Sequence, residues 1–425
     1  MAASASASAS ASASASASAS GRGGLRFRED PSGSGRGVFK VVQVTDLHCG
    51  EEAARDDATG RLVVKLVRLE APVDLVVISG DLASGYARHS HATGWFEALY
   101  ARCVGPLQAE GVPWTFILGN HDGDGELGPE ALVGRVARDS LTSADGRDDI
   151  AGVTNYFLDV ESSQEGERGG EGKTGRAVAS RLWFLDSGSA GCEGTEGWGC
   201  VGTSAVDWFR REAAAFRGAR GGARGSARDV GFVHIPPVEA RRAWNARENA
   251  AWGTKGEGVC CSPRDTGLVE AMRAEGVAGL FFGHDHNNDF QVRVEGGELD
   301  PILLGYGRKT GYGGYGPVDG HGEYMGRGAR VVELTEGGGG GGGEGGMSTW
   351  FRDGASGEVQ FPAPVPASER DYVPFCCQRG HELVVRYTEY ACVAVLLVGA
   401  VLYHVRRSYA KAKQMGLFLK SKRYM

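Results

Sequence analysis

The sequence has no excess of positive charge and no common nucleic-acid-binding signature. Its 425 residues include 46 Lys and Arg against 53 Asp and Glu, which gives a net charge of −7. A protein that binds the phosphate backbone needs a basic face, and the sequence contains no helix-turn-helix, zinc-finger or RNA-binding pattern. We therefore predict that nucleic acid is not a partner.

The cysteines form no regular framework. There are nine of them, an odd number, and no C-x-x-C spacing indicates a structural zinc site. Cys192 and Cys200 flank a Gly-rich loop and could form a bridge. Because cysteine is often a small buried hydrophobic residue, we expect most of the thiols to be free.

The start of the chain lacks the apolar core of a secretory signal. Residues 1–20 alternate almost entirely between alanine and serine, and a Gly/Arg/Ser stretch follows to Gly37. Such a segment buries too little apolar surface to offset its ordering entropy. We therefore expect residues 1–37 to be disordered. The chain also has no N-x-Ser/Thr glycosylation sequon.

The end of the chain predicts a membrane anchor. Residues 390–405 contain no Asp, Glu, Lys or Arg, and extension back to Tyr387 gives 19 residues, enough for a helix to cross a hydrocarbon core of roughly 30 Å. We predict a Pro-rich linker at 361–386, a transmembrane helix at 387–405 and a basic tail at 406–425. The alternative is a buried amphipathic helix of the domain that precedes it.

The charge of the tail bears on membrane topology. Residues 406–425 carry seven Lys and Arg and no carboxylate, and the positive-inside rule places such a tail in the cytosol. The final residues 422–425 also loosely resemble a dibasic retrieval signal. We expect a single-pass membrane protein of the endomembranes or cell surface. A tail anchor that faces the cytosol is the alternative, because signal peptide and sequon are both missing.

From Val38 onward, apolar runs of strand length alternate with helical patterns. Continuous Val/Ile/Leu runs such as residues 38–45 and 73–79 are typical of a sheet that is buried on both faces, and the alternation with helices indicates βαβ crossovers. We predict an α/β fold of two packed mixed β-sheets flanked by helices over residues 38–360, closed by a hairpin. We expect the polar inserts at 161–176, 217–228 and 336–346 to be solvated loops.

Five short motifs place polar side chains where predicted strands end. The motifs are DLH, GD, GNHD, an isolated histidine before two prolines, and GHDH. Ligands that follow strands in an open sheet converge at one edge of that sheet. The side chains that these motifs supply are Asp46, His48, Asp81, Asn120, His121, Asp122, His234, His284 and His286.

Most of these residue types are ligands for a pair of metal ions. Two cations about 3.5–4 Å apart repel each other and need an anionic bridge, for which Asp81 is the candidate. We expect Asp46, His48 and His286 to complete one site. We expect Asn120, His234 and His284 to complete the other. Imidazole favours zinc, iron and manganese over calcium, so the predicted cofactors are two divalent or trivalent ions of Fe, Zn or Mn.

This series of motifs resembles that of the calcineurin-like metallophosphoesterases, which share D-x-H, G-D-x-x, G-N-H-D/E, H and G-H-x-H. The chain is more narrowly similar to the short purple-acid-phosphatase-like proteins of plants and fungi. That similarity is carried by LDSG at 185–188, Trp208-Phe209, HIP at 234–236, GHDHNNDF at 283–290 and GYGRKTGYGGYG at 305–316. The resemblance spans residues 38–360 and implies the family's four-layer sandwich.

The resemblance also implies a mechanism and further site residues. A metal-bound hydroxide would attack phosphorus, and His121 would donate a proton to the leaving group while Asp122 holds its ring. We expect Arg308 or Lys309 to contact the phosphate and Glu257 to lie near the cleft. One departure concerns the tyrosine that colours true purple acid phosphatases: its position holds Ser84, and the nearest tyrosine is Tyr86. We therefore expect a colourless enzyme.

Three functions are compatible with these residues. The leading prediction is a phosphomonoesterase that acts on a phosphorylated small molecule or phosphoprotein. A phosphodiesterase or pyrophosphatase would use the same metals. The third is a catalytically inactive scaffold held at a membrane, although such a protein would not need all seven ligands together with His121.

Overall fold

The computed structural model describes residues 24–30, 35–144, 149–168, 173–218, 226–318, 322–337, 345–377, 401–408 and 411. The chain divides into two units, Met1–Cys376 and Cys377–Met425. All of the named helices and strands belong to the first unit.

One sheet has eight strands in the order β1-β6-β7-β10-β12-β14-β13-β11. Its strands are β1 (Leu25–Arg26), β6 (Tyr156–Arg168), β7 (Lys173–Phe184), β10 (Val230–Phe232), β11 (Ala250–Trp252), β12 (Gly279–Phe282), β13 (Gln291–Val294) and β14 (Ile302–Tyr306). The central strands β7, β10, β12 and β14 are parallel. Their carboxyl ends therefore meet at one edge, where His234 and His284 follow β10 and β12.

The other sheet has seven strands in the order β17-β16-β15-β3-β4-β5, with β2 paired to β3. Its strands are β2 (Arg28–Glu29), β3 (Gly37–Val44), β4 (Leu75–Ser79), β5 (Trp114–Ile117), β15 (Gly328–Thr335), β16 (Gly346–Asp353) and β17 (Val359–Gln360). Strands β3, β4 and β5 are parallel, and Asp46, Asp81 and Asn120 follow them in turn. A separate hairpin pairs β8 (Ala190–Cys192) with β9 (Thr195–Trp198).

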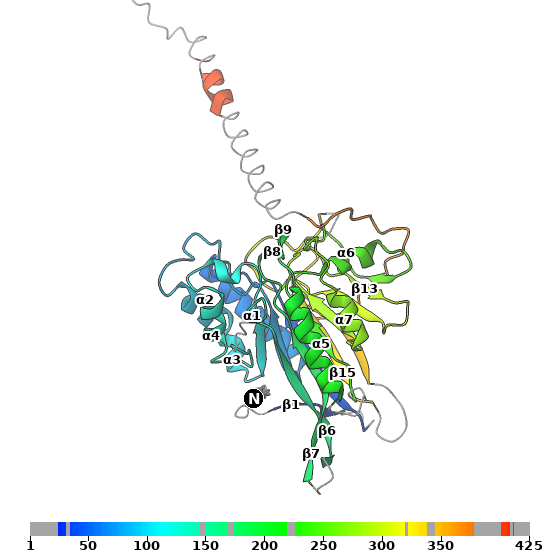
Figure 1. Ribbon diagram of the computed structural model, residues 1–425. Coiled ribbons are helices and arrows are strands. Elements are labelled where there is room, and N and C mark those ends of the chain that lie inside the picture. The colour runs from blue at the N-terminus through cyan, green and yellow to red at the C-terminus, as the bar shows by residue number, and fades with distance from the viewer. Residues whose placement is uncertain are drawn as a thin grey trace, which may run out of the picture. The chain divides into compact units, whose positions relative to one another are not determined.

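The two sheets pack face to face between two layers of helices (Figure 1). Phe39 and Val41 of β3 lie in the apolar layer between the sheets, whereas Val42 and Val44 face the helices, because successive strand residues point to opposite faces. The predicted fold of two packed mixed sheets with flanking helices is confirmed. The helices are α1 (Ala53–Glu70), α2 (Trp95–Cys103), α3 (Gly105–Ala109) and α4 (Pro129–Val136) against one sheet, and α5 (Thr203–Gly218), α6 (Val238–Asn245) and α7 (Leu268–Ala274) against the other.

The prediction of a loop at 161–176 was wrong. Strands β6 and β7 extend into it and pair as an antiparallel hairpin, in which Glu165 pairs with Arg176 and Arg168 with Lys173 (Figure 1), while residues 169–172 lie outside the described residues. Hydrogen bonds between the two main chains form whatever the side chains are, so a polar composition does not exclude a strand. Of the other two inserts, residues 219–225 and 338–344 lie outside the described residues.

The predicted disorder at 1–37 was wrong for the end of that range. Strand β1 pairs with β6, and β2 pairs with β3. Phe27 is 1% exposed, with its ring centroid 5.7 Å from that of Phe39. Two buried apolar side chains, Leu25 and Phe27, thus attach this stretch to both sheets. Residues 1–23 and 31–34 lie outside the described residues.

The predicted linker at 361–386 is described as far as Cys377, and its first part lies against α6. Trp244 Nε1 donates to the carbonyl oxygen of Asp371 at 3.0 Å, and Asn245 Nδ2 donates to that of Val373 at 2.8 Å. Val373 is buried. These residues therefore belong to the packed domain and extend it beyond residue 360.

The predicted transmembrane helix at 387–405 falls mostly on residues 378–400, which lie outside the described residues. Residues 401–408 are helical. No helix within the described part of the chain has both the length and the apolar character needed to cross a membrane.

The expectation of mostly free thiols was wrong, although the bridge between Cys192 and Cys200 is confirmed. Cys260 and Cys377 are also disulfide-bonded, and two further bonds join Cys49 to Cys103 and Cys261 to Cys376. They close loops of 54 and 115 residues, so the sequence offers no local signal for them. Cys49 directly follows His48, so its disulfide ties a predicted ligand loop to the end of α2.

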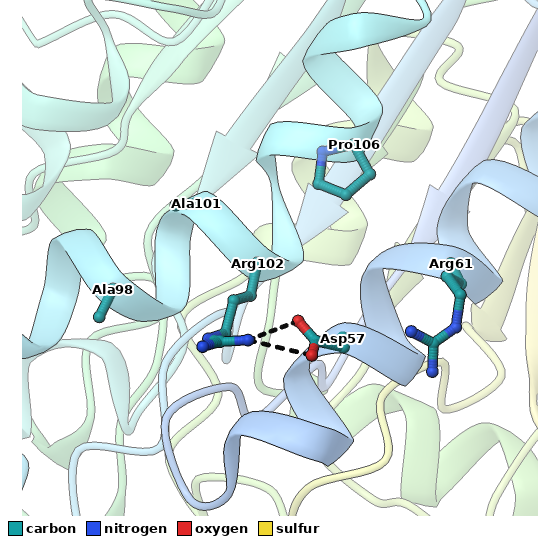
Figure 2. A pocket seen from close by; sticks show the side chains of 6 residues that line it. All are labelled: Asp57, Arg61, Ala98, Ala101, Arg102 and Pro106. Atoms are coloured by element: carbon teal, nitrogen blue, oxygen red, sulfur yellow. Dashed lines mark hydrogen bonds and ion pairs between the residues drawn. The ribbon is translucent and has the colours of Figure 1, made fainter.

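A hollow on the outer side of this domain lies between α1 and the α2–α3 segment (Figure 2). Arg102 Nη1 lies 2.8 and 3.0 Å from the two carboxylate oxygens of Asp57. The hollow is lined by Asp57, Arg61, Ala98, Ala101, Arg102 and Pro106. None of these residues is a predicted ligand.

Candidate metal centre

Four predicted ligands from three parts of the chain meet in one buried cluster. Asp46, His48, Asp81 and His286 each bring one ligand atom, and these atoms all lie within 4.8 Å of one another. The Nε2 atoms of His48 and His286 are 3.0 Å apart, and His286 Nε2 is 3.4 Å from Asp46 Oδ1. This is the first predicted ligand set together with the predicted bridge.

The second predicted set lies on the other side of Asp81. The Oδ2 atom of Asp81 is 3.3 Å from His234 Nε2 and 3.4 Å from His48 Nε2. One carboxylate oxygen therefore faces a histidine of each set. Asn120 Oδ1 is 3.1 Å from His234 Nε2. The rings of His234 and His284 have centroids 5.4 Å apart. The structure therefore brings all seven predicted ligands together around Asp81.

The backbone at four of these ligands is in a conformation that non-glycine residues rarely adopt. The φ angles are +54° at Asp46, +47° at His48, +51° at Asp81 and +78° at His284. Such angles cost free energy and cluster at functional sites, where the surrounding structure enforces them. Here they turn the chain sharply after a strand, so that the ligand side chains point across the sheet edge.

Hydrogen bonds on the far side of the imidazole rings select the tautomer that binds metal. His234 Nδ1 donates to the carbonyl oxygen of Ser79 at 2.9 Å, and His286 Nδ1 donates to that of Tyr315 at 2.9 Å. Because a carbonyl only accepts, each Nδ1 carries a proton, and each Nε2 is the ring atom that faces the other ligands. A partner at the far nitrogen is typical of metal-binding histidines.

The buried histidines also have the electrostatics of metal ligands. Burial lowers the pKa of His284 to about 3, which keeps its ring neutral, the form that binds metal. Its Nε2 atom is buried and has no hydrogen-bond partner. At His234 burial opposes protonation, but the Asp81 carboxylate raises the pKa to about 10. The orphaned Nε2 of His284 and the carboxylates that favour positive charge at His234 both fit a site for cations, in which a bound cation would replace the proton on His234 Nε2.

The glycine-rich loop at 305–316 packs directly on the ligands. A Cβ atom at Gly313 would lie 1.9 Å from the carbonyl oxygen of His48. At Gly314, where φ is +66°, it would lie 3.0 Å from His286 Cε1 and 3.2 Å from His48 Cδ2. Only glycine allows this backbone to approach two ligand rings so closely.

Arg308 does not have the surroundings expected of a phosphate ligand. Its side chain is buried, and Nη2 lies 2.6 Å from Asp289 Oδ2 while Nη1 donates to Gln360 Oε1 at 2.6 Å. We correct the predicted phosphate contact to a structural ion pair, since a buried carboxylate already binds this guanidinium. Lys309 is also buried, and its Nζ donates to the carbonyl oxygen of Asp46 at 2.9 Å, which supports a ligand loop.

The structure places a different carboxylate beside the His121 ring from the one predicted. Asp122 does not hold the ring: its carboxylate accepts main-chain N–H groups from Asp81, Ala83 and Gly119 at 3.0, 2.8 and 2.7 Å. The carboxylate beside the ring belongs to Asp124, whose Oδ2 lies 3.4 Å from His121 Nδ1. Asp122 thus shapes the Asp81 loop, and Asp124 is placed to orient His121.

Two more side chains border the ligands. Glu257, which the sequence placed near the cleft, accepts the N–H of Asn287 at 2.7 Å next to His286. Trp198 was not predicted; its ring centroid lies 4.4 Å from that of His284. The sequence does contain a signal for this contact, since Trp198 lies between two glycines inside the short loop that the Cys192–Cys200 disulfide closes. Such a short closed loop holds a large ring against the domain.

Comparisons with known proteins agree with this geometry. The family model for calcineurin-like phosphoesterase matches residues 39–288. Probable inactive purple acid phosphatase 28 of Arabidopsis thaliana is 29% identical over 362 residues, which cover 77% of this chain and 82% of the relative. Phosphatase DCR2 of Saccharomyces cerevisiae is 26% identical over 64% of this chain and 48% of its own length.

Among solved structures, purple acid phosphatase PPD1 from yellow lupin seeds aligns with a TM-score of 0.42 at 13% identity, over 77% of this chain and 54% of its own. The family match spans more than half of the sequence and contains all seven predicted ligands. The predicted resemblance is thereby confirmed. The chain belongs to the calcineurin-like phosphoesterase family, whose members are hydrolases that act on phosphate esters and use a dinuclear metal site.

Proposed function

We propose that this chain is a metal-dependent phosphomonoesterase that binds two cations of Fe, Zn or Mn. The observation that carries the proposal is the position of Asp81, whose Oδ2 faces His48 and His234 at 3.4 and 3.3 Å. A carboxylate shared by two sets of ligands is what an adjacent pair of cations requires.

When bound, the cations supply Lewis acidity that activates water and neutralises charge on the phosphoryl oxygens. Asp46, His48, His286 and Asp81 would hold one of them, and Asn120, His234 and His284 the other together with Asp81. The main-chain N–H of His121 donates to Asp81 Oδ1 at 2.9 Å, which fixes the start of the His121–Asp124 segment relative to the ligands.

His121 donates a proton to the leaving-group oxygen in this proposal. Its ring centroid lies 5.5 Å from that of His48, and its side chain is 20% exposed, so it borders the ligands and still reaches incoming substrate. Asp124 stabilises the protonated ring and orients it. A side chain placed for proton transfer in this way contributes about 10²–10⁴-fold to the rate.

The names of relatives favour phosphomonoesters over diesters. The relatives that match 64–77% of the chain are named purple acid phosphatases or a phosphatase. A probable cyclic nucleotide phosphodiesterase of Psychrobacter arcticus matches only 25% of it. The substrate would be a phosphorylated small molecule or phosphoprotein.

The second candidate function is a catalytically inactive scaffold. Three Arabidopsis thaliana relatives have the words "probable inactive" in their names. Against this candidate, the chain keeps six predicted ligands around Asp81 and a histidine at their border, a set that a scaffold does not need.

Turnover measurements separate these functions. The purified full-length chain, reconstituted with manganese, zinc or iron, should hydrolyse a phosphomonoester at least tenfold faster than a matched diester or pyrophosphate. It should show no visible absorption band, because Ser84 occupies the position of the colouring tyrosine. Metal bound at two ions per chain without turnover of any of the three esters would favour the scaffold.

We also propose that the catalytic domain faces a lumen or the outside, held to the membrane by residues 387–405. The disulfides support this location, because such bonds persist in oxidising compartments and are rare in the cytosol. Cys49 and Cys103 are both buried, and Cys49 directly follows the predicted ligand His48.

Protease protection tests this topology. In sealed microsomes, the catalytic domain should resist added protease and become sensitive when detergent opens the vesicles, whereas an epitope after Met425 should be removed in both conditions. The rival arrangement, a tail anchor facing the cytosol, predicts digestion of the domain without detergent. Alkylation before and after reduction should then report disulfides only in the protected form.

A further inference from the structure

Tyr315 contacts one of the predicted ligand histidines in two ways. Its carbonyl oxygen accepts the Nδ1–H of His286 at 2.9 Å, and its ring stacks on the imidazole with centroids 4.1 Å apart and planes at 21°. The hydrogen bond sets the rotation of the imidazole within its own plane, and the stacked ring sets the tilt of that plane. Together the two contacts fix the direction of Nε2, which lies 3.4 Å from Asp46 Oδ1.

Glu257 holds the far end of the Tyr315 ring. The Tyr315 hydroxyl donates to this carboxylate and lies 3.1 Å from each of its oxygens. The same carboxylate accepts the main-chain N–H of Asn287, the residue after His286, at 2.7 Å. One side chain thus ties the ring that covers His286 to the main chain that carries His286.

The segment that carries Glu257 is bonded to the ligand loop as well. The main-chain N–H groups of Gly256 and Glu257 both donate to Asn288 Oδ1, at 3.0 and 3.1 Å. Asn288 is buried, and its Nδ2 donates to the carbonyl oxygen of Gly258 at 3.2 Å. These bonds hold the main chain at Glu257 against the residues that follow His286, which places its carboxylate beside Tyr315.

The ligand histidine of the second set is supported by a sheet instead. His234 closely follows β10, and its Nδ1 donates to the carbonyl oxygen of Ser79, the last residue of β4. His286 and Tyr315 lie on the loops beyond β12 and β14. Loops position side chains less precisely than strands do. The contacts through Glu257 therefore supply the support that strands give to His234.

We propose that Tyr315, held by Glu257, is a positioning residue that orients His286 and so sets the cation affinity of the site that His286 shares with Asp46. This inference deepens the proposed function, because it rests on the two-cation site assigned there. It concerns how tightly that site binds a cation, so it can be tested without turnover. Groups that orient a metal ligand from behind change metal affinity by about 10–100-fold when they are removed.

The measurement is zinc binding by the metal-free, full-length protein in competition with a chromophoric chelator. Tyr315→Leu removes the stacked ring and should weaken one of two bound zinc ions by about 10–100-fold while the other keeps its affinity. Tyr315→Phe keeps the ring and should weaken the same ion by only about twofold to tenfold, the effect of one hydrogen bond. Tyr312→Phe is the matched control in the same loop, where the ring lies under the Arg327 guanidinium at 4.5 Å, and should bind both ions as wild type does.

The link to Glu257 has its own test. Glu257→Ala should weaken the same zinc ion, and its effect should be smaller in the Tyr315→Phe background, where the bond between the two side chains is already broken. Equal effects in both backgrounds would overturn the role of Glu257. Both variants keep the stacked ring, so they test the proposal even where Tyr315→Leu does not fold.

A further variant shows whether Tyr315 acts through His286. In a His286→Ala background, Tyr315→Leu should leave the remaining zinc ion unaffected, because the group that it orients is gone. A merely structural role predicts instead that Tyr315→Leu weakens both ions in wild type, weakens the remaining ion in His286→Ala and lowers the unfolding temperature of the metal-free protein.

The outcomes keep this inference separate from the proposed function. The structural pattern, or wild-type binding of both ions by Tyr315→Leu, would overturn the positioning role and leave the proposed hydrolysis in place. A wild-type protein that binds two zinc ions, of which Tyr315→Leu weakens one, but that hydrolyses no phosphate ester would overturn the proposed hydrolysis and leave the positioning role in place.

Discussion

Asp81→Asn is expected to lose at least one bound metal ion per chain and about a thousandfold in turnover. Loss of the shared negative charge removes several kcal/mol of stabilisation from the cations and the transition state, and each 1.4 kcal/mol corresponds to a factor of ten. The substitution changes the charge of the side chain without changing its size or its backbone preference. The φ angle at Asp81 is +51°, and asparagine adopts this left-handed conformation about as readily as aspartate does.

The measurement is elemental analysis of the purified variant together with its kcat on a phosphomonoester. Asp57→Asn provides the control, because Asp57 lies in the outer hollow of Figure 2 and pairs only with Arg102 among its described contacts. That variant should keep metal content and turnover. Thermal unfolding of both variants would show that the fold persists. If Asp81→Asn retained two metals and wild-type turnover, the shared-carboxylate assignment would be wrong.

The fold was predictable because its strands are apolar on both faces. Val41 and Val42 point to opposite sides of β3, one toward the other sheet and one toward the helices. Only a sheet covered on both sides requires that pattern. The ligands were predictable for a related reason: each follows such a strand in the sequence, and parallel strands bring their carboxyl ends to one edge.

What could not be predicted depends on contacts between distant residues. The Cys261–Cys376 disulfide spans 115 residues, and nothing local to either cysteine indicates its partner. The β6–β7 hairpin has a loop-like composition, but its hydrogen bonds are made by the main chain. At Arg308 the sequence shows a charge and not the buried Asp289 that neutralises it.

His121→Ala is expected to slow hydrolysis of esters with poor leaving groups by about 10²–10⁴-fold, the usual contribution of a positioned proton donor. An alkoxide needs a proton as it departs, whereas an acidic phenol leaves as its anion without help. The same variant should therefore lose much less activity on an activated aryl ester. The measurement is kcat over a series of monoesters, plotted against the acidity of the leaving alcohol, for which the variant should show a steeper dependence than wild type.

Substitutions of Asp122 and Asp124 test which of the two carboxylates orients His121. Asp124→Asn removes the carboxylate that lies 3.4 Å from His121 Nδ1. It should lower kcat about tenfold for the ester with the poorest leaving group, as loss of an orienting partner does, and so steepen the same dependence. Asp122→Asn disturbs an acceptor of three main-chain N–H groups, so it should lower the unfolding temperature and slow all esters alike. The opposite pattern is a steeper dependence in Asp122→Asn and an unchanged dependence in Asp124→Asn. It would show that Asp122, and not Asp124, orients His121. The leaving-group dependence decides between them because a loss of stability reduces the amount of active enzyme equally for every substrate.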